Sequence, residues 1–380
     1  MFINKALNVF LTSFFLKPYK YMKRKIGICF GGYCPLHQGH LDLIMKSKKE
    51  NDIVYVIICG FDEEPRALEI GLPLRRRISL VRKLFLGDEQ IRILELNDSD
   101  LGIDESMSQN NWKIWTSAIK HKIQYNDQEN DYLWYLAEED YKLNLEALGF
   151  KVCLMERINP ISGTAIRKNP LKLWNKIAWT FRPYFSTNIL ITGTASEGKS
   201  TLTRDIATYF SLPYSTEYGR TYMEENGKTD VDLTINDFLE FLIEQRRQTK
   251  EKIESPGNQG IVISDTDNLV TLMYARAYVD DPSIDLTKKD YDSLLAVAKN
   301  LQRGITWNKI FLLPPKNDFV DDGSRYMAQS SIEERTKSYN ILTNLLHEFG
   351  WWDKVEIING NFLENFETVK NYINSLRNVE

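Results

Sequence analysis

The chain has 380 residues, of which 43% are hydrophobic and 26% charged, and its formal net charge is −4. That length predicts two or three domains, and the composition excludes a wholly disordered chain. The small negative charge argues against a protein whose main task is non-specific binding to DNA or RNA, because such binding needs a basic surface. Four cysteines in so long a chain do not make a disulfide framework, so we expect a reducing, cytoplasmic location.

Residues 1–23 precede the first predicted strand, and we expect them to be an extension outside the fold, with a natural start at Met22. The apolar run from Ala6 to Leu16 is interrupted by polar side chains and is shorter than the roughly 20 apolar residues that span a bilayer. No small-residue cleavage site follows it, so a signal peptide is the less favoured alternative. No other stretch approaches a membrane span, and stable membrane insertion is not expected.

Residues 24–168 have the pattern of one α/β domain. Strands are predicted over 25–30, 52–59, 91–96, 132–136 and 152–155, and helices over 39–49, 75–85 and 112–123. The second strand is almost continuously apolar, which is typical of a strand that is buried on both faces. Strands that alternate with helices are joined by right-handed crossovers, so the sequence predicts a parallel sheet.

The next stretch, residues 169–186, is rich in aromatic side chains and is expected to be a helical connector. The α/β pattern then restarts over residues 187–380. Strands are predicted over 188–192, 261–264 and 309–313, and helices over 199–210, 238–253, 293–302 and 332–349. The sequence therefore predicts two α/β domains in series.

Two of the four histidines, His37 and His40, follow the first strand and a Gly-Gly turn at the start of a helix. An α/β sheet binds phosphates at such a place, with helix N–H groups facing the ligand. Two imidazoles three residues apart can donate to the same phosphate oxygens, and Gly39 lets a nucleotide approach the backbone. A zinc site that also uses Cys29 and Cys34 is a weaker alternative, because structural zinc sites separate their ligand pairs by a longer loop. The histidines could also be ordinary core or surface residues.

A second motif, residues 193–200, fits the pattern G-x-x-x-x-G-K-S/T between an apolar strand and a helix. In such a P-loop the backbone N–H groups hold the phosphates, Lys199 reaches the β and γ oxygens, and Ser200 is a ligand of Mg²⁺. We therefore expect a second ATP site formed by Gly193, Thr194, Ala195, Ser196, Glu197, Gly198, Lys199, Ser200 and Thr201.

Polar segments downstream of the P-loop are expected to select the phosphate acceptor. Asp265 and Asp267 follow a buried strand, where Asp265 would organise Mg²⁺ together with Ser200. Glu217 follows the first β–α unit of this half, and the sequence does not decide between Glu217 and Asp267 as the catalytic base. A substrate clamp or lid is expected from Arg220, Asp322 and Arg325.

Residues 31–40 have the pattern G-x-Y-x-P-x-H-x-G-H, which resembles the signature of the nucleotidyltransferases that include nicotinamide-mononucleotide adenylyltransferases. The second motif of that superfamily, Ile-Ser-x-Thr-x-x-Arg, stands at 161–167. Ser162 can cap a helix whose N-terminus, with Thr164 and Arg167, clamps ATP phosphates. The ATP site expected in this domain comprises Gly31, His37, Gly39, His40, Ser162, Thr164 and Arg167.

From about Lys25 to its C-terminus the chain resembles the bifunctional nicotinamide-nucleotide adenylyltransferase and ribosylnicotinamide kinase family, the NadR family. The resemblance implies a Rossmann-like nucleotidyltransferase domain followed by a P-loop kinase α/β domain. It also implies that ATP, nicotinamide riboside, nicotinamide mononucleotide (NMN) and NAD are ligands. One of the pair Trp112 and Trp115 would stack on a nicotinamide ring, although their spacing is equally that of core residues.

The chain departs from the family pattern in two ways that matter for function. Many members carry a helix-turn-helix module first, and the residues before the first strand leave no room for one, so DNA binding is not expected. Gly32 and Ala165 stand where relatives often have lysine. An alternative is therefore a riboside kinase whose first domain senses nucleotides without catalysis, and a further alternative is a fusion of the coenzyme A synthase type. Assembly into a homo-oligomer and a functional link to a riboside transporter stay open.

Overall fold

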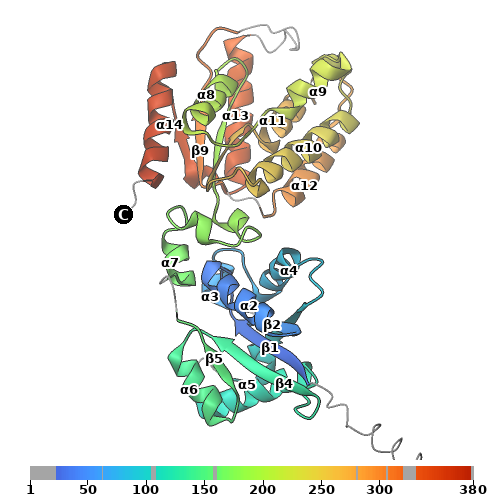
Figure 1. Cartoon of the computed structure of the whole chain (residues 1–380). Coiled ribbons are helices and arrows are strands. Elements are labelled where there is room, and N and C mark those ends of the chain that lie inside the picture. The colour runs from blue at the N-terminus through green and yellow to red at the C-terminus, as the bar shows by residue number, and fades with distance from the viewer. Residues whose placement is uncertain are drawn as a thin grey trace, which may run out of the picture. The chain divides into compact units, whose positions relative to one another are not determined.

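The computed structural model describes residues 23–61, 63–103, 108–156, 161–279, 281–304, 307–319 and 331–377. The chain divides into two compact units (Figure 1). The first contains residues up to 33 together with 39–64 and 73–160, and the second contains 34–38, 65–72 and the chain from Ile161 onwards. The predicted extension, apart from Lys23, and the predicted lid residues Asp322 and Arg325 lie outside the described residues.

The first unit is built on a five-stranded sheet with the order β3-β2-β1-β4-β5. Every pairing in it is parallel, which confirms the prediction from the alternating pattern. The strand order reverses beside β1, and ligands of open α/β sheets bind at the carboxyl ends of strands at such a point. The strands are β1 (Arg24–Gly31), β2 (Ile53–Gly60), β3 (Ile91–Asn97), β4 (Asn130–Leu136) and β5 (Val152–Leu154).

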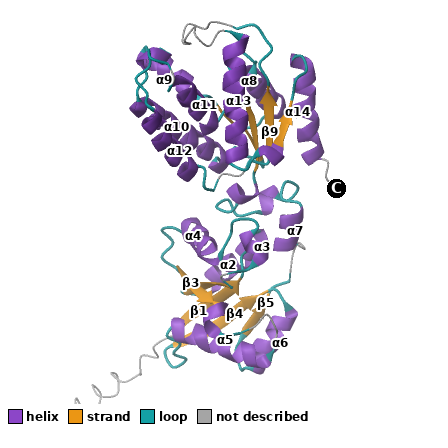
Figure 2. Cartoon of the chain, turned by 180° about the vertical axis from the view of Figure 1, so that it is seen from behind, coloured by secondary structure: helices purple, strands orange, loops and turns teal. Residues whose placement is uncertain are grey.

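Helices cover both faces of this sheet, which is why its central strands are apolar on both sides. Helices α2 (Gln38–Glu50) and α4 (Leu74–Leu84) lie on one face, and α5 (Gln109–Lys122) and α6 (Glu139–Ala147) on the other (Figures 1 and 2). The core on the α5 side contains Ile26, Ile28, Ile57, Cys59, Leu96, Trp112, Trp115, Ile119 and Leu145.

The second unit has another five-stranded parallel sheet, with the order β10-β9-β6-β8-β7. Strands β6, β8 and β9 were expected from their apolar runs. The two edge strands β7 and β10 were not, because two or three residues are too few to show a period. The strands are β6 (Thr187–Gly193), β7 (Tyr214–Ser215), β8 (Ile261–Asp265), β9 (Lys309–Leu313) and β10 (Val355–Ile357).

Alternate side chains of β6 pack into different cores, as the two-residue period of a strand requires. Ile189 and Ile191 pack with α8 (Lys199–Phe210) and α14 (Phe362–Arg377). Leu190 belongs to the core on the opposite face. That face is covered by α10 (Ile235–Glu254), α11 (Asn268–Tyr278), α12 (Lys288–Leu301) and α13 (Ile332–Glu348).

The connector 169–186 differs from the expected helical segment. All of its residues are described, and they form two short 3-10 turns, η2 (Trp174–Lys176) and η3 (Arg182–Phe185), with no α-helix. Pro183 stands in the first turn of η3, where its missing N–H is tolerated. The segment is held by packing instead, since the Trp174 indole is buried and donates to the Asn258 carbonyl oxygen at 2.9 Å.

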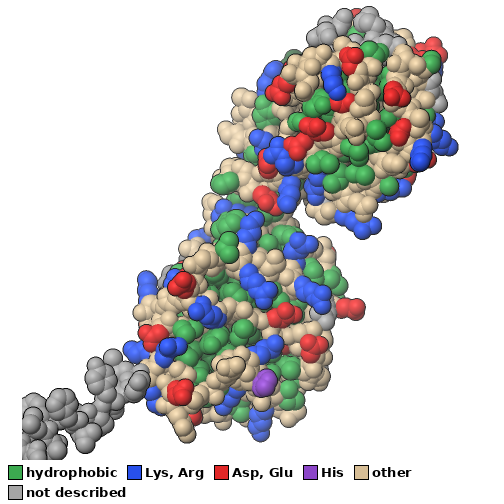
Figure 3. All heavy atoms as spheres, turned by 90° about the vertical axis from the view of Figure 1, so that its right-hand side faces the viewer, with side chains coloured by type: hydrophobic (Ala, Val, Ile, Leu, Met, Phe, Trp, Pro, Cys, Tyr) green, Lys and Arg blue, Asp and Glu red, His purple; other side chains and the backbone are tan. Residues whose placement is uncertain are grey.

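The surface carries charges of both signs. Acidic and basic side chains share the face in Figure 3, in keeping with 48 Lys and Arg residues against 52 Asp and Glu residues in the chain. Among the described residues, none of the helices has the length and apolarity needed to cross a bilayer.

Candidate functional sites

The P-loop joins β6 to α8, as the sequence predicts. Gly193 has a φ of 150°, and a Cβ there would come within 2.4 Å of the Leu313 carbonyl oxygen, so this position requires glycine. Gly198, with a φ of 80°, turns the chain into the first turn of α8. Lys199 is buried and its Nζ donates to the Thr194 carbonyl oxygen at 2.7 Å, within the loop itself. Backbone N–H groups in such a turn, together with a helix N-terminus, attract anions.

Asp265 ends β8 beside the P-loop strand and is buried. Burial raises the pKa of Asp265 to about 6, and the charge of Glu217 adds to the rise, whereas Lys199 and a hydrogen bond from Ser200 oppose it. Its Oδ1 has no hydrogen-bond partner among the described residues. Mg²⁺ prefers oxygen ligands, and a buried carboxylate oxygen of this kind beside a serine hydroxyl suits it. Ser200 and Asp265 therefore fit the magnesium site predicted from the sequence.

Asp267 has a different environment. Its Oδ1 caps α11 by accepting the Leu269 N–H at 3.0 Å, and the Gln302 side-chain amide reaches Oδ2 at 3.4 Å. Burial raises the pKa of Asp267 to about 7. The side chain does not line the pocket beside the P-loop, whereas Glu217 does. This arrangement favours Glu217 where the sequence left the catalytic base open.

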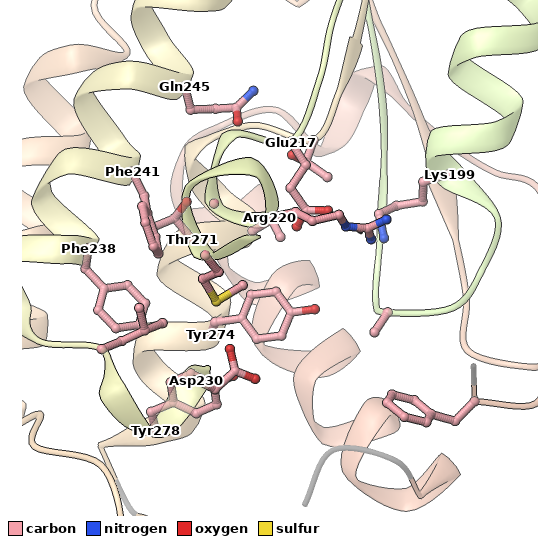
Figure 4. Close-up of a pocket in the computed structure, with 17 residues that line it drawn as sticks. Lys199, Glu217, Arg220, Asp230, Phe238, Phe241, Gln245, Thr271, Tyr274 and Tyr278 are labelled. Carbon is pink, nitrogen blue, oxygen red and sulfur yellow. Dashed lines mark hydrogen bonds and ion pairs between the residues drawn. The ribbon is translucent and has the colours of Figure 1, made fainter. Parts of the chain in front are cut away.

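The pocket opens beside the P-loop (Figure 4). Lys199, Glu217 and Arg220 lie together on one side of it, and Arg220 Nη2 is 3.5 Å from Glu217 Oε2. Asp230, the first residue of η4 (Asp230–Asp232), lies away from that group, where its carboxylate accepts a hydrogen bond from Tyr278. The walls come from α10, α11 and the segment after β9, and they include Phe238, Phe241, Tyr274, Tyr278 and Phe319.

This pocket can hold a flat ring together with a hydroxyl group. Aromatic faces stack on planar rings and attract cations, and Asp230 adds a negative charge to the aromatic side. Glu217 lies near the P-loop, where an acceptor hydroxyl would meet a phosphate. The sequence analysis missed Asp230 and the aromatic walls. On α10 and α11 such side chains have ordinary core spacing, and α11 itself is too evenly apolar to show a helical period.

The residues of the second nucleotidyltransferase motif are organised by α7 (Gly163–Lys168). Ser162 caps this helix as expected, accepting an N–H of its first turn at 3.1 Å. Arg167 donates through Nη1 to the Cys34 carbonyl oxygen at 2.5 Å and through Nη2 to Thr164 Oγ1 at 3.0 Å. The motif thus lies against residues 34–38, the segment that carries the buried His37.

In the first unit, His40 lies on α2 and its ring meets that of Tyr33 edge to face, with centroids 4.9 Å apart. The glycine turn after β1 is supported by Arg77 of α4, which is fully buried and donates to the Gly32 carbonyl oxygen. Glu64 pairs with Arg77 at 2.8 Å. The sequence analysis missed Arg77, since it is one of three successive arginines and the pattern does not tell which of them is buried.

The tryptophan pair belongs to the core. Trp112 and Trp115 are 7% and 8% exposed, meet edge to face at 5.6 Å, and both pack on Phe30. Contact between either ring and nicotinamide stays a prediction. Among the described residues no group of three or more His, Cys, Asp or Glu side chains could hold a metal ion. Burial in β1 raises the pKa of Cys29 to about 12, which disfavours the thiolate that zinc needs.

Two family models match the chain, one for each unit. The cytidylyltransferase-like family matches residues 28–169, and a family described as an AAA domain matches residues 188–364. These matches agree with the two sheets and assign the histidine motif to a nucleotidyltransferase-like half and the P-loop to an AAA-type half.

Individual proteins similar to this chain share both halves. A crystal structure of a NadR protein in complex with NR is 32% identical, with a TM-score of 0.81 over 94% of this chain and 97% of that one. A NadR protein in complex with NAD and AMP-PNP is 30% identical, with a TM-score of 0.79 over 94% and 98%. The trifunctional NAD biosynthesis/regulator protein NadR of Escherichia coli K12 is 25% identical over 339 residues, which are 86% of this chain and 77% of that protein.

Proposed function

This chain belongs to the NadR family, and from that premise we propose that it makes NAD in two ATP-dependent steps. The first is phosphorylation of nicotinamide riboside to NMN at the P-loop. The second is adenylyl transfer from ATP to NMN, which gives NAD and pyrophosphate. One observation carries the proposal: the P-loop opens onto a pocket with aromatic walls and carboxylates on two sides.

The pocket complements the chemistry of nicotinamide riboside. Its pyridinium ring is flat and permanently cationic, so it gains from aromatic faces and from the carboxylate of Asp230. With the ring on that side, the ribose would extend towards Glu217 and Lys199, which lie together on the other side of the pocket in Figure 4. Arg220 pairs with Glu217 and steadies its carboxylate. A neutral ring of the same size would gain less from this pocket.

In the kinase step the riboside 5′-oxygen attacks the γ-phosphorus of ATP, and the bond to the β-phosphate breaks to release ADP. Glu217 orients the hydroxyl group and accepts its proton. Lys199 and the P-loop N–H groups stabilise the charge that develops on the β and γ oxygens. Ser200 and Asp265 would hold Mg²⁺, which supplies further neutralisation of phosphate charge when it is bound.

In the transferase step a phosphate oxygen of NMN attacks the α-phosphorus of ATP, and pyrophosphate leaves. No covalent intermediate with the protein is needed, because positioning and charge stabilisation suffice. His40 is proposed to stabilise the α-phosphate in transit, and His37 and Arg167 the departing phosphates. Ser162 and Thr164 complete the ATP site through the first turn of α7.

The test is a time course with purified protein, Mg-ATP and nicotinamide riboside, with the products separated by chromatography. We expect NMN to appear first and NAD to follow. Accumulation of NMN without NAD, even with added NMN and ATP, would show that the first domain binds nucleotides without catalysing adenylyl transfer. Failure to form NMN would overturn the kinase assignment. The coenzyme A synthase alternative is less favoured, because the similarity to NadR proteins extends over both halves.

A further inference from the structure

One side chain of the P-loop is fully withdrawn from solvent. Glu197 is the fourth variable residue of the motif, and its side chain is 1% exposed. It pairs with Arg335 of α13, itself 3% exposed, at 2.6 Å between Oε1 and Nη1. A buried carboxylate and guanidinium of this kind hold each other in a fixed geometry, since both charges are costly to leave unpaired.

The pair also holds the segment that follows β9. Glu197 accepts the Lys316 N–H at 3.2 Å, and it accepts both the backbone N–H and the side-chain amide of Asn317, at 3.3 and 3.0 Å. Arg335 Nη2 donates back to the Asn317 carbonyl oxygen at 2.7 Å. One carboxylate therefore joins the P-loop, the β9 exit and α13.

That segment reaches the substrate pocket two residues later. Phe319 lines the pocket together with Ala195 and Lys199. The Lys316 ammonium fixes the same segment from the other side by donating to the carbonyl oxygens of Asn359 and Gly360, at 3.0 and 2.6 Å. The hydrogen bonds and the ion pair of Glu197 thus fix the position of the P-loop relative to the pocket wall at Phe319.

We propose that Glu197 and Arg335 are positioning residues for phosphoryl transfer. Together they hold the P-loop against residues 316–319, so that the γ-phosphate and the acceptor hydroxyl meet in line. The proposal rests on the proposed kinase function. Neither side chain lines the pocket beside the P-loop, but a displacement of about 1 Å at a reacting centre can cost about 100-fold in rate.

The variants separate positioning from stability. The neutral pair Glu197→Gln/Arg335→Met removes both charges and keeps an amide oxygen for the Asn317 N–H. Replacing a buried pair by neutral side chains is often tolerated in stability, whereas removal of one partner is not. Arg335→Lys keeps the charge and loses the planar fork that reaches Asn317. The control is Lys337→Met on the same helix, whose ammonium is exposed and pairs with Glu334 at 2.7 Å.

Urea unfolding shows whether each variant is folded. The rate of NMN formation gives kcat and KM. Binding of a fluorescent ATP analogue, measured with Mg²⁺ and without riboside, reports ATP affinity. We expect the folded neutral pair to lose at least about 10-fold in kcat and in affinity for the analogue. Arg335→Lys should lose less, and Lys337→Met should match wild type.

A folded neutral pair with wild-type kcat, KM and analogue affinity would overturn the proposal. If the neutral pair does not fold, Arg335→Lys is measured in the same assays, and wild-type kcat, KM and analogue affinity in that variant would overturn the proposal. If the wild type forms no NMN, the kinase proposal fails, and analogue binding alone still tests the role of the pair at the P-loop.

Discussion

The buried Asp267 offers a test that separates a capping carboxylate from a catalytic one. Asparagine caps helices about as well as aspartate, and it cannot ionise. The change Asp267→Asn should therefore keep the cap of α11 and remove a carboxylate that is unfavourable to bury when charged. We expect this variant to keep riboside kinase activity and to be more stable than wild type at alkaline pH.

The magnitude follows from the pKa of Asp267, which burial raises from its ordinary value of 3.8 to about 7. The folded state then binds this proton more tightly than the unfolded state does. Stability of the wild type accordingly falls as pH rises from about 4 to about 7 and is constant above that range. At about 1.4 kcal/mol per pKa unit, Asp267→Asn should gain about 3 kcal/mol relative to wild type between about pH 5 and pH 8.

Urea unfolding of both proteins at the two pH values measures this gain in unfolding free energy. Titration of Asp265 does not affect the difference between the two proteins, because both retain Asp265. The matched variant Glu217→Gln should keep wild-type stability and lose NMN formation. A gain in stability that does not change with pH would refute the linkage argument. Loss of kcat by about 100-fold in a folded Asp267→Asn, with Glu217→Gln active, would make Asp267 the base instead.

Four further outcomes are expected. Lys199→Ala should lower NMN formation by about 10²–10³-fold and leave any adenylyl transfer intact, so equal loss of both activities in a folded protein would contradict two separate ATP sites. Kinase activity should fall as pH drops through about 6, where Asp265 becomes protonated, and higher Mg²⁺ should move the midpoint down; a flat profile would contradict its metal role. Asp230→Asn should raise KM for the cationic riboside more than for its neutral dihydro form, and equal effects would argue against charge recognition. His40→Ala should abolish NAD formation from NMN while kinase activity persists, which a coupled assay of both products will show.

The architecture could be predicted from the sequence because its determinants are local. The apolar runs of β1, β2, β6, β8 and β9 and the two glycine turns show where parallel strands end and phosphates bind, and the structure confirms both sheets. The short edge strands and the connector could not be predicted. Pairing at a sheet edge and the packing of a turn such as Trp174 on Asn258 depend on residues that are distant in sequence.

The site was predictable only where a motif binds phosphate through its backbone. Lys199 and Asp265 were identified by their positions next to β6 and β8. The pocket beside the P-loop could not be predicted, because Phe241, Tyr274 and Phe319 come from three separate segments and each has the spacing of a core residue. Asp267, which the sequence offered as an alternative catalytic base, accepts a hydrogen bond from the first turn of α11, and its role stays a prediction that Asp267→Asn tests. Sequence spacing alone does not determine the direction of these side chains, and the structure supplies it.

The charge near the histidine motif also depends on residues that are distant in the sequence and close in the fold. Neither Gly32 nor Ala165 supplies the lysine charge that the family resemblance led us to expect there, whereas the structure places the Arg77 guanidinium on the Gly32 carbonyl oxygen. That guanidinium does not replace the missing charge, because Glu64 pairs with it at 2.8 Å and both side chains are buried, so the net local charge is zero. We therefore expect the two histidines and Arg167 to supply most of the side-chain charge stabilisation in adenylyl transfer. For this reason the loss of NAD formation on His40→Ala should be large.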